Sequence, residues 1–394
     1  MDVIDWRTAQ RVGELVAGSP PFGGVRSASV EPLAREFAGR VSAYSGLRVN
    51  GELPVLELVD RPGWIAANLR TMRPLLAPLT EQMSASNGLL AGPLRSASGL
   101  LLGVQVGALA GMLSQRVLGQ YEVSLLDAQT RPRLLLLAPN LAQAARNLGV
   151  DRDELVLWVS IHEITHAVQF AGAPWLREYL GGMLSELIEG MRLTIAGEDS
   201  DDDEDGANGA GRRGGLAGGL PKMPDLGAWA ANLPDPAQLR EMIERARHGE
   251  LLRVTLGEER WALVERMQAA MSLIEGHAEH TMDAIGAEVL PTLPRLRAAM
   301  TRRRENRGLP WRVLERLLGL ELKLRQYELG RRFCDAVVQA GGEQALAPAW
   351  RGPESLPSGE ELERPSLWIA RMDAANAGRG LDEQGRTHVP PVTS

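Results

Sequence analysis

Cysteine is nearly absent from this sequence: Cys334 is the only one among 394 residues. A single thiol excludes an internal disulfide framework and is typical of proteins in a reducing compartment. The first residues, Met1 to Trp6, also lack the basic segment and apolar run of a secretory signal. Both absences predict a cytoplasmic protein.

Aromatic residues are scarce too, at 4% of the chain, so the core must be built mostly from Leu, Ala, Val and Met. Because strand formers are aromatic or β-branched, this composition favours helices over sheets. We therefore expect a mainly α fold.

Long apolar runs are missing. The most apolar stretch, from Gly99 to Leu113, is shorter than the ~20 residues that a helix needs to cross a bilayer. Its glycines recur at every fourth position and would form a smooth stripe on one helix face, where a neighbouring backbone can approach closely. We expect tight packing of a buried helix and no membrane span. These glycines are Gly99, Gly103, Gly107 and Gly111.

The sequence also lacks a strong positive charge. The net charge is −7, and the segment from Glu198 to Asp205 carries seven acidic residues, so the rest of the chain sums to about zero. No global field favours nucleic acid or an anionic membrane. A local basic cluster, Arg302 to Arg304 with Arg307, lacks interleaved aromatic residues and is typical of a solvated helix end. We expect no nucleic-acid partner.

Composition divides the chain into four segments that together form one catalytic unit. Residues 1–196 are largely helical in pattern, whereas residues 197–221 are acidic and then Gly-rich, which predicts a disordered loop. Residues 222–372 return to helical patterns. The tail at 373–394 is rich in Gly, Pro and polar residues and is expected to be disordered.

Two short strand-like runs interrupt the helical pattern. Tyr121 to Leu126 and Arg133 to Leu137 are separated by a turn-prone segment, which predicts a β-hairpin. The second run could present an edge to an extended peptide by strand addition. An ordinary structural edge strand is at least an equal alternative.

The chemistry of the chain concentrates in the HEITH motif at residues 162–166. On an α-helix, positions i and i+4 lie about 40° apart on one face, so His162 and His166 can reach one metal ion. Glu163 is rotated by about 100° from His162, which places it to contact a water molecule at the metal rather than to act as a ligand. Asp151 is expected to cap this helix. Two core-facing histidines can instead be satisfied by hydrogen bonds alone.

A catalytic zinc site needs a third protein ligand and leaves the fourth position to water. On the predicted helix over 258–290, Glu275 lies closest to the centre of the apolar stripe, Glu279 lies further out, and His277 and His280 point to the side or rear. A carboxylate beside a buried stripe is costly unless it is paired or bound to metal. We therefore predict Glu275 as the third ligand and Glu279 as a partner that orients a histidine. Glu279, His277 and His280 remain alternative ligands, or residues of a polar helix edge.

Five motifs occur in order along the chain. They are Arg61-Pro62-Gly63-Trp64 with Ala67-Asn68, the run from Leu113 to Tyr121, HEITHAVQF at 162–170, EGHAEHTMD at 275–283, and Lys323 to Tyr327. This ordered set resembles the type-2 zincin-like metallopeptidases, a family first described as a domain of unknown function. The resemblance covers most of residues 3–372. It implies a mainly α-helical zincin-like fold with a small β-hairpin or sheet beside the HExxH helix, and a zinc hydrolase activity.

The residues and the resemblance together predict a hydrolase that uses Zn²⁺ to cleave a peptide or a small amide. Glu163 would accept the proton of the attacking water and deliver it to the leaving amine. The alternative is a non-catalytic zinc-binding or interaction protein that retains the site for structure. An intact Glu163 argues against this alternative, whereas His277 or His280 as a fourth ligand would favour it.

Overall fold

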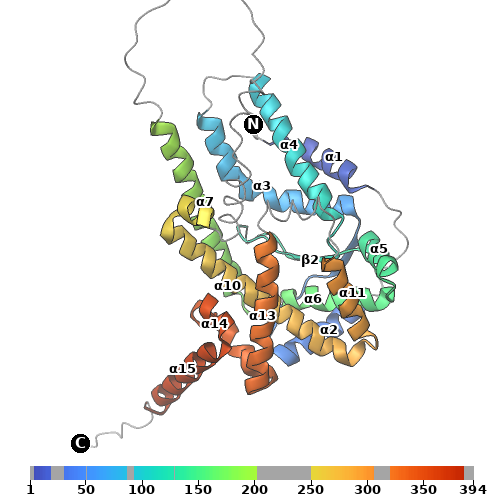
Figure 1. Cartoon of the computed structure of the whole chain (residues 1–394), viewed down its shortest axis with the longest axis vertical. Coiled ribbons are helices and arrows are strands. Elements are labelled where there is room, and N and C mark those ends of the chain that lie inside the picture. The colour runs from blue at the N-terminus through green and yellow to red at the C-terminus, as the bar shows by residue number, and fades with distance from the viewer. Residues whose placement is uncertain are drawn as a thin grey trace, which may run out of the picture. The chain divides into compact units, whose positions relative to one another are not determined.

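The computed structural model describes residues 4–18, 31–49, 51–86, 93–127, 129–201, 250–305 and 320–385 of the chain (Figure 1). This part is mainly helical and contains a three-stranded sheet, which confirms the predicted fold class. The α-helices are α1 (Trp6–Ala17), α2 (Glu31–Ser45), α3 (Arg61–Ser86), α4 (Pro93–Ser114), α5 (Ala138–Leu148), α6 (Arg152–Gly172), α7 (Trp175–Asp201), α10 (Glu250–Val289), α11 (Leu293–Glu305), α13 (Leu320–Gly341), α14 (Gly359–Glu363) and α15 (Pro365–Gly385). Two 3-10 helices, η2 (Glu343–Trp350) and η3 (Pro353–Ser355), follow α13.

The sheet has the strand order β1-β3-β2, with β1 at Leu56–Val59, β2 at Gly119–Glu122 and β3 at Arg133–Leu137. β2 and β3 pair antiparallel, so the predicted hairpin is present, although its first strand begins two residues earlier than expected. β3 also pairs with β1, in parallel. The suggestion that β3 offers a free edge is therefore wrong, because both of its sides are already hydrogen-bonded.

The glycine stripe of α4 lies against α1. A Cβ atom added to Gly107 would lie 2.2 Å from the carbonyl oxygen of Ala9, and one added to Gly111 would lie 2.5 Å from that of Gly13. The two backbones can approach this closely only because the stripe has no side chains. The predicted tight packing is confirmed, and none of the described helices is long and apolar enough to cross a membrane.

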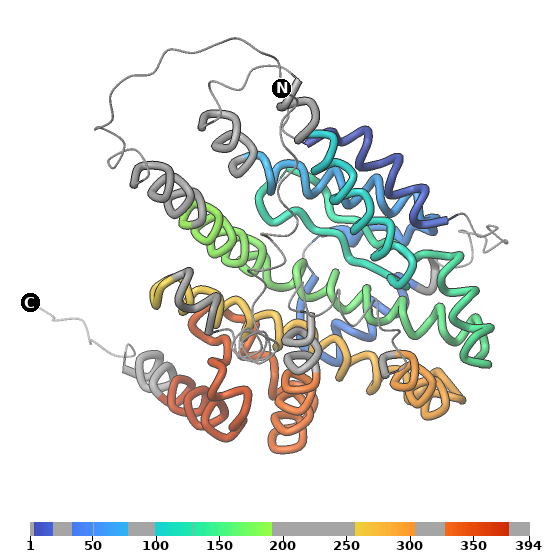
Figure 2. Tube along the Cα trace, turned by 45° about the horizontal axis from the view of Figure 1, so that its top comes forward, coloured from blue at the N-terminus to red at the C-terminus, as the bar shows by residue number. Residues whose placement is uncertain are grey.

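Helix α6 is well defined at its start and surrounded by other elements. The Asp151 side chain accepts hydrogen bonds from the backbone N–H groups of Asp153 and Glu154, so the predicted N-cap is confirmed. α2, α5, β2 and β3 all pack against α6. Figure 2 shows the second half of α10 (gold) running beside α6 (green), although the two helices are far apart in the sequence. The candidate site lies on this α6–α10 contact.

Two compact units divide the chain: Met1–Ser185 with Glu265–Ser394, and Glu186–Val264. The first unit contains the sheet, α6 and the second half of α10. In the second unit, Gly190 of α7 contacts Arg260 of α10. The segments 197–221 and 373–394 were expected to be disordered, but both are helical at their start. α7 continues to Asp201 and α15 continues to Gly385. The remainder of the predicted acidic loop, at 202–221, lies outside the described residues.

Candidate metal centre

His162 and His166 lie on adjacent turns of α6 and point to the same side of the helix. Their Nε2 atoms are 3.2 Å apart, and the two rings meet edge to face. Both side chains are largely buried, with 23% and 11% of their surfaces exposed. The helix periodicity thus places the two imidazoles as the motif predicts.

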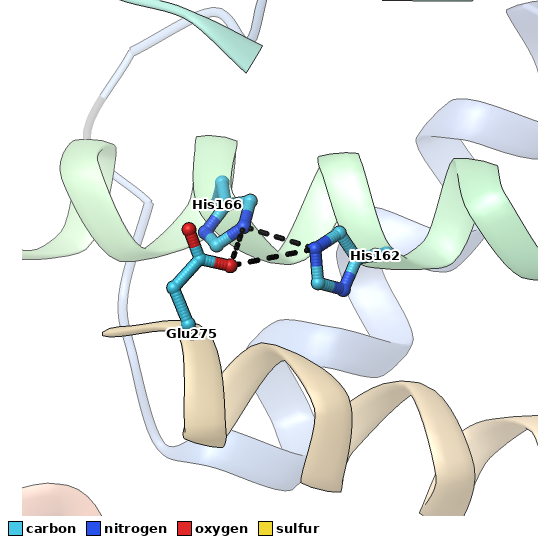
Figure 3. Close-up of side chains that lie close together, drawn as sticks. All are labelled: His162, His166 and Glu275. Carbon is cyan, nitrogen blue, oxygen red and sulfur yellow. Dashed lines mark hydrogen bonds and ion pairs between the residues drawn. The ribbon is translucent and has the colours of Figure 1, made fainter. Parts of the chain in front are cut away.

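Glu275 reaches this pair from α10, as Figure 3 shows. Its Oε2 atom lies 3.3 Å from Nε2 of His166 and 3.7 Å from Nε2 of His162. For zinc bonds of about 2.0–2.1 Å in a tetrahedral site, the donor atoms should be about 3.3 Å apart. Two imidazole nitrogens and one carboxylate oxygen at these spacings fit a zinc ion and leave its fourth position open.

The charges of this group explain the pKa of His166. Burial acts to lower this pKa, but the neighbouring carboxylates of Glu275 and Glu163 and the hydrogen bond with Gln169 raise it to about 9. In the metal-free protein the carboxylates are therefore balanced by a protonated imidazole. A divalent cation would take over this role and displace the proton.

Glu163 lies under β2, on the side of α6 that faces the sheet. Its carboxylate is buried and accepts a 2.7 Å hydrogen bond from the backbone N–H of Tyr121. Burial raises its pKa to about 7, with a further contribution from Glu275 and opposing effects of His166 and Tyr121. A carboxyl group that titrates near neutrality is suited to both accepting and donating a proton.

Gly119 provides the space for this carboxylate. A Cβ atom at Gly119 would lie 2.8 Å from Cγ and 2.9 Å from Oε1 of Glu163, and 2.8 Å from Cγ1 of Val159. β2 can therefore pass directly over the glutamate only with glycine at this position. The role of Gly119 cannot be predicted from its local sequence, because its contact is with a residue 44 positions further along the chain.

Gln169 is a second residue that the sequence analysis missed. Its side chain is fully buried and contacts His166 Nδ1 at 2.9 Å, His277 Nδ1 at 2.9 Å and the carbonyl oxygen of Ile274 at 2.8 Å. One feature of the sequence could have identified Gln169: it is a polar side chain three residues after His166, on the buried face of the same helix. Gln169 thereby connects a candidate ligand on α6 to the turn of α10 that carries Glu275.

The two histidines of α10, His277 and His280, lie in different surroundings. Burial, with smaller effects of His280 and His166, lowers the pKa of His277 to about 3, so this ring is neutral. His280 contacts Asp335 through Nδ1 at 2.6 Å and the hydroxyl of Tyr44 through Nε2 at 2.7 Å. Within the described residues, neither histidine belongs to the three-residue group.

Glu279 lies one turn beyond Glu275 on α10 and is partly buried. It is also outside the three-residue group. Its proposed role in orienting a histidine stays a prediction; for His166, the ring nitrogen that faces away from Glu275 is held by Gln169.

An open cleft of about 980 Å³ runs along α6 just after His166. Tyr121 of β2 and Phe170 of α6 form part of its wall, with their rings 5.5 Å apart. Arg177 crosses its rim and donates to the carbonyl oxygens of Ser124 and Asp127. Its described lining includes Ala167, directly after His166, and Tyr121, which donates to Glu163, but not the three candidate ligands themselves.

Comparison with known proteins found a matching family model and a similar solved structure. A family model described as zincin-like metallopeptidase matches residues 4–369. The chain is also similar to the crystal structure of a candidate hydrolase with a novel fold from Chloroflexus aurantiacus, with 29% identity and a TM-score of 0.61. That match covers 94% of this chain and 99% of the other. No curated protein matches the chain.

Proposed function

The chain belongs to the zincin-like metallopeptidase family, and from this premise we propose that it is a zinc-dependent hydrolase that cleaves peptide or amide bonds. The observation that carries the proposal is the convergence of His162, His166 and Glu275 from two helices, with Glu163 beside them. The hydrolase-like neighbour of known structure is consistent with this activity.

In this proposal, Nε2 of His162, Nε2 of His166 and Oε2 of Glu275 hold the zinc ion. A bound zinc ion would polarise the carbonyl of the substrate and lower the pKa of a water molecule. The chain contributes the fixed positions of the three donors, because α6 carries two of them and α10 is held against α6 by Gln169.

Glu163 is the proposed general base. The Tyr121 N–H fixes one of its carboxylate oxygens, and burial keeps its pKa near 7, so that it can take a proton from water and return it to the leaving amine. The adjacent cleft along Tyr121 and Phe170 would hold the substrate beside this carboxylate.

A non-catalytic zinc protein is the second candidate. A structural site usually has four protein ligands. His277 and His280, the proposed additional ligands, are instead engaged by Gln169 and by Asp335 and Tyr44. An open fourth position with a buried glutamate beside it favours catalysis.

Metal content tests the site. After exhaustive dialysis, elemental analysis of the purified wild type should show nearly one zinc per chain, and His162→Ala and Glu275→Ala should each lose it. Zinc retained by Glu275→Ala would move the third ligand to another residue. Absence of zinc from the wild type, even after reconstitution, would contradict the proposal.

Catalysis is tested separately with Glu163→Gln. Peptide libraries incubated with the zinc-loaded wild type should yield cleavage products by mass spectrometry, and Glu163→Gln should keep its zinc but lose about 10²–10⁴-fold in rate. The exposed Glu363→Gln is the matched control and should cleave like the wild type. A Glu163→Gln variant as active as the wild type would refute this role while leaving the metal site intact.

A further inference from the structure

A second cleft, of about 970 Å³, lies away from the candidate metal centre, where the ends of α1, α4 and α11 meet α5 and the start of α3. The hydrogen bonds from Arg303 to the carbonyl oxygen of Arg116, and from Arg295 to that of Gly149, hold α11 beside α4 and α5. None of the residues that line this cleft takes part in the proposed reaction.

The lining of this cleft is strongly basic. Five arginines contribute to it, and its described lining contains no acidic residue. Most of the remaining lining residues carry side-chain amides, and the cleft exposes more polar than apolar surface. The arginines are Arg61, Arg116, Arg146, Arg302 and Arg303.

Arg61 provides an independent indication of a missing negative charge. It is only 8% exposed, and its guanidinium donates to the carbonyl oxygen of Ala17 at 2.6 Å, to Asn140 Oδ1 at 2.8 Å and to Gln143 Oε1 at 3.0 Å. All three partners are neutral. Burial lowers its pKa, and no carboxylate among the described residues opposes this effect. A buried guanidinium without a counter-charge is costly, and a bound anion would offset that cost.

The position of Arg61 is itself fixed by the fold. Asn140 lies in the first turn of α5 and donates to the carbonyl oxygens of Ser114 and Val117, which orients its own oxygen toward Arg61. α5 begins at Ala138, so Asn140 is its third residue. The charge is thus held at the wall of the cleft by a built hydrogen-bond network.

We propose that this cleft binds a compact, multiply charged phosphate compound, such as a diphosphate-bearing small molecule. Guanidinium groups match phosphate oxygens in charge and in paired N–H geometry, and the amide side chains can donate further hydrogen bonds. The volume lies in the usual range for small-molecule sites. The described lining has no aromatic residue on which a base could stack, which favours a small ligand over a single-stranded nucleic acid.

Sodium pyrophosphate is the probe for this site, titrated calorimetrically into the full chain in a phosphate-free buffer at about 0.15 M salt. We expect saturable binding at one site. Arg146→Gln combined with Arg302→Gln should weaken it by about tenfold or more. Both residues are exposed lining residues, so the double variant should fold normally. The double variant Arg7→Gln and Arg266→Gln removes the same charge at exposed positions outside the cleft and should bind like the wild type.

Three further titrations distinguish this proposal from its alternatives. Pyrophosphate also coordinates zinc, so His162→Ala is titrated in parallel; loss of binding in this variant would assign it to the metal centre and overturn the proposal. Citrate should bind more weakly than pyrophosphate, and equal binding would refute phosphate selectivity. Tighter binding of a short DNA duplex than of pyrophosphate, or no saturable binding, would also overturn the proposal.

Discussion

The amide oxygen of Gln169 lies 2.9 Å from Nδ1 of His166, which determines how this imidazole can act. An amide oxygen only accepts, so Nδ1 of His166 carries a hydrogen. When the ring loses its second proton, Nε2 is therefore the nitrogen whose lone pair faces Glu275 and can bind a metal ion. The amide nitrogen of Gln169 donates to Ile274 O and His277 Nδ1. One side chain thus sets the tautomer of a candidate ligand and the position of the helix that supplies another.

Replacement of Gln169 by leucine should therefore weaken zinc binding. The substitution keeps the approximate volume but removes the buried hydrogen bonds that Gln169 makes with His166, His277 and Ile274. We expect zinc affinity to fall by about 10–100-fold and the free energy of unfolding by about 2–4 kcal/mol. Competition with a chromogenic chelator measures the affinity, and urea unfolding measures the stability.

Thr165→Val is the matched control for this prediction. Thr165 is equally buried on α6, but its hydroxyl donates only to the carbonyl oxygen of Ile161 in the same helix. Its loss should change stability with little effect on zinc affinity. If Gln169→Leu bound zinc as tightly as Thr165→Val, the positioning role of Gln169 would have to be abandoned.

Gly119→Ala should impair turnover without removing the metal. The new methyl group would overlap Cγ and Oε1 of Glu163 and force the carboxylate to move. Because a displacement of about 1 Å in a catalytic group can cost about 100-fold in rate, we expect a loss of this order in kcat, with zinc content near one per chain. Gly39→Ala, on α2 with no atom close to the added Cβ, is the control and should behave like the wild type. Unchanged kcat in Gly119→Ala would show that the glutamate does not need its present position.

The close crossing of α10 and α13 at Gly276 and Gly330 should be intolerant of any side chain. A Cβ atom at Gly276 would lie 2.1 Å from the carbonyl carbon of Gly330, and backbone cannot yield as a flexible side chain does. Gly276→Ala should lower the free energy of unfolding by about 2–3 kcal/mol and, since Glu275 is adjacent, also weaken zinc binding. Gly286→Ala, in the same helix with its nearest neighbour at 3.4 Å, should be neutral or slightly stabilising in the same urea titration. Equal stabilities of the two variants would contradict this account.

The sequence was sufficient to predict the features that depend only on residues close together in the chain. The spacing of His162 and His166, the cap at Asp151 and the glycine stripe of α4 all follow from helix periodicity, and the structure agrees with each. Even the choice of Glu275 over its neighbours came from its place on an apolar stripe, and it is the carboxylate that the structure brings to the two histidines.

What the sequence did not reveal depends on contacts between distant segments. Strand β1 was not recognised, because it has only four residues and pairs with β3 more than 70 residues later. Gln169 gains its role from Ile274, 105 residues away, and Gly119 gains its role from the side chain of Glu163. Periodicity indicates which face of an element is buried, but not which element covers it.

Zinc binding should release a proton from His166. The pKa of this residue is raised from 6.5 to about 9 in the metal-free protein: burial opposes the shift, and the carboxylates of Glu275 and Glu163 outweigh it. The stability gained from the protonated imidazole is therefore fully present below pH 6.5 and lost as the pH rises through about 9. A metal ligand must be neutral imidazole, so the cation and the proton compete for the same nitrogen.

This competition has a measurable sign and size. Between pH 6.5 and about 9, zinc affinity should rise by about tenfold per pH unit, and calorimetry near pH 7.5 in two buffers of different ionisation enthalpy should show release of about one proton from His166. Glu275→Gln removes the carboxylate that contributes most to raising the pKa, so NMR of the metal-free variant should find His166 titrating well below its wild-type value. An affinity that did not change with pH would mean that His166 is already neutral, and that the two carboxylates do not act on it as their distances indicate.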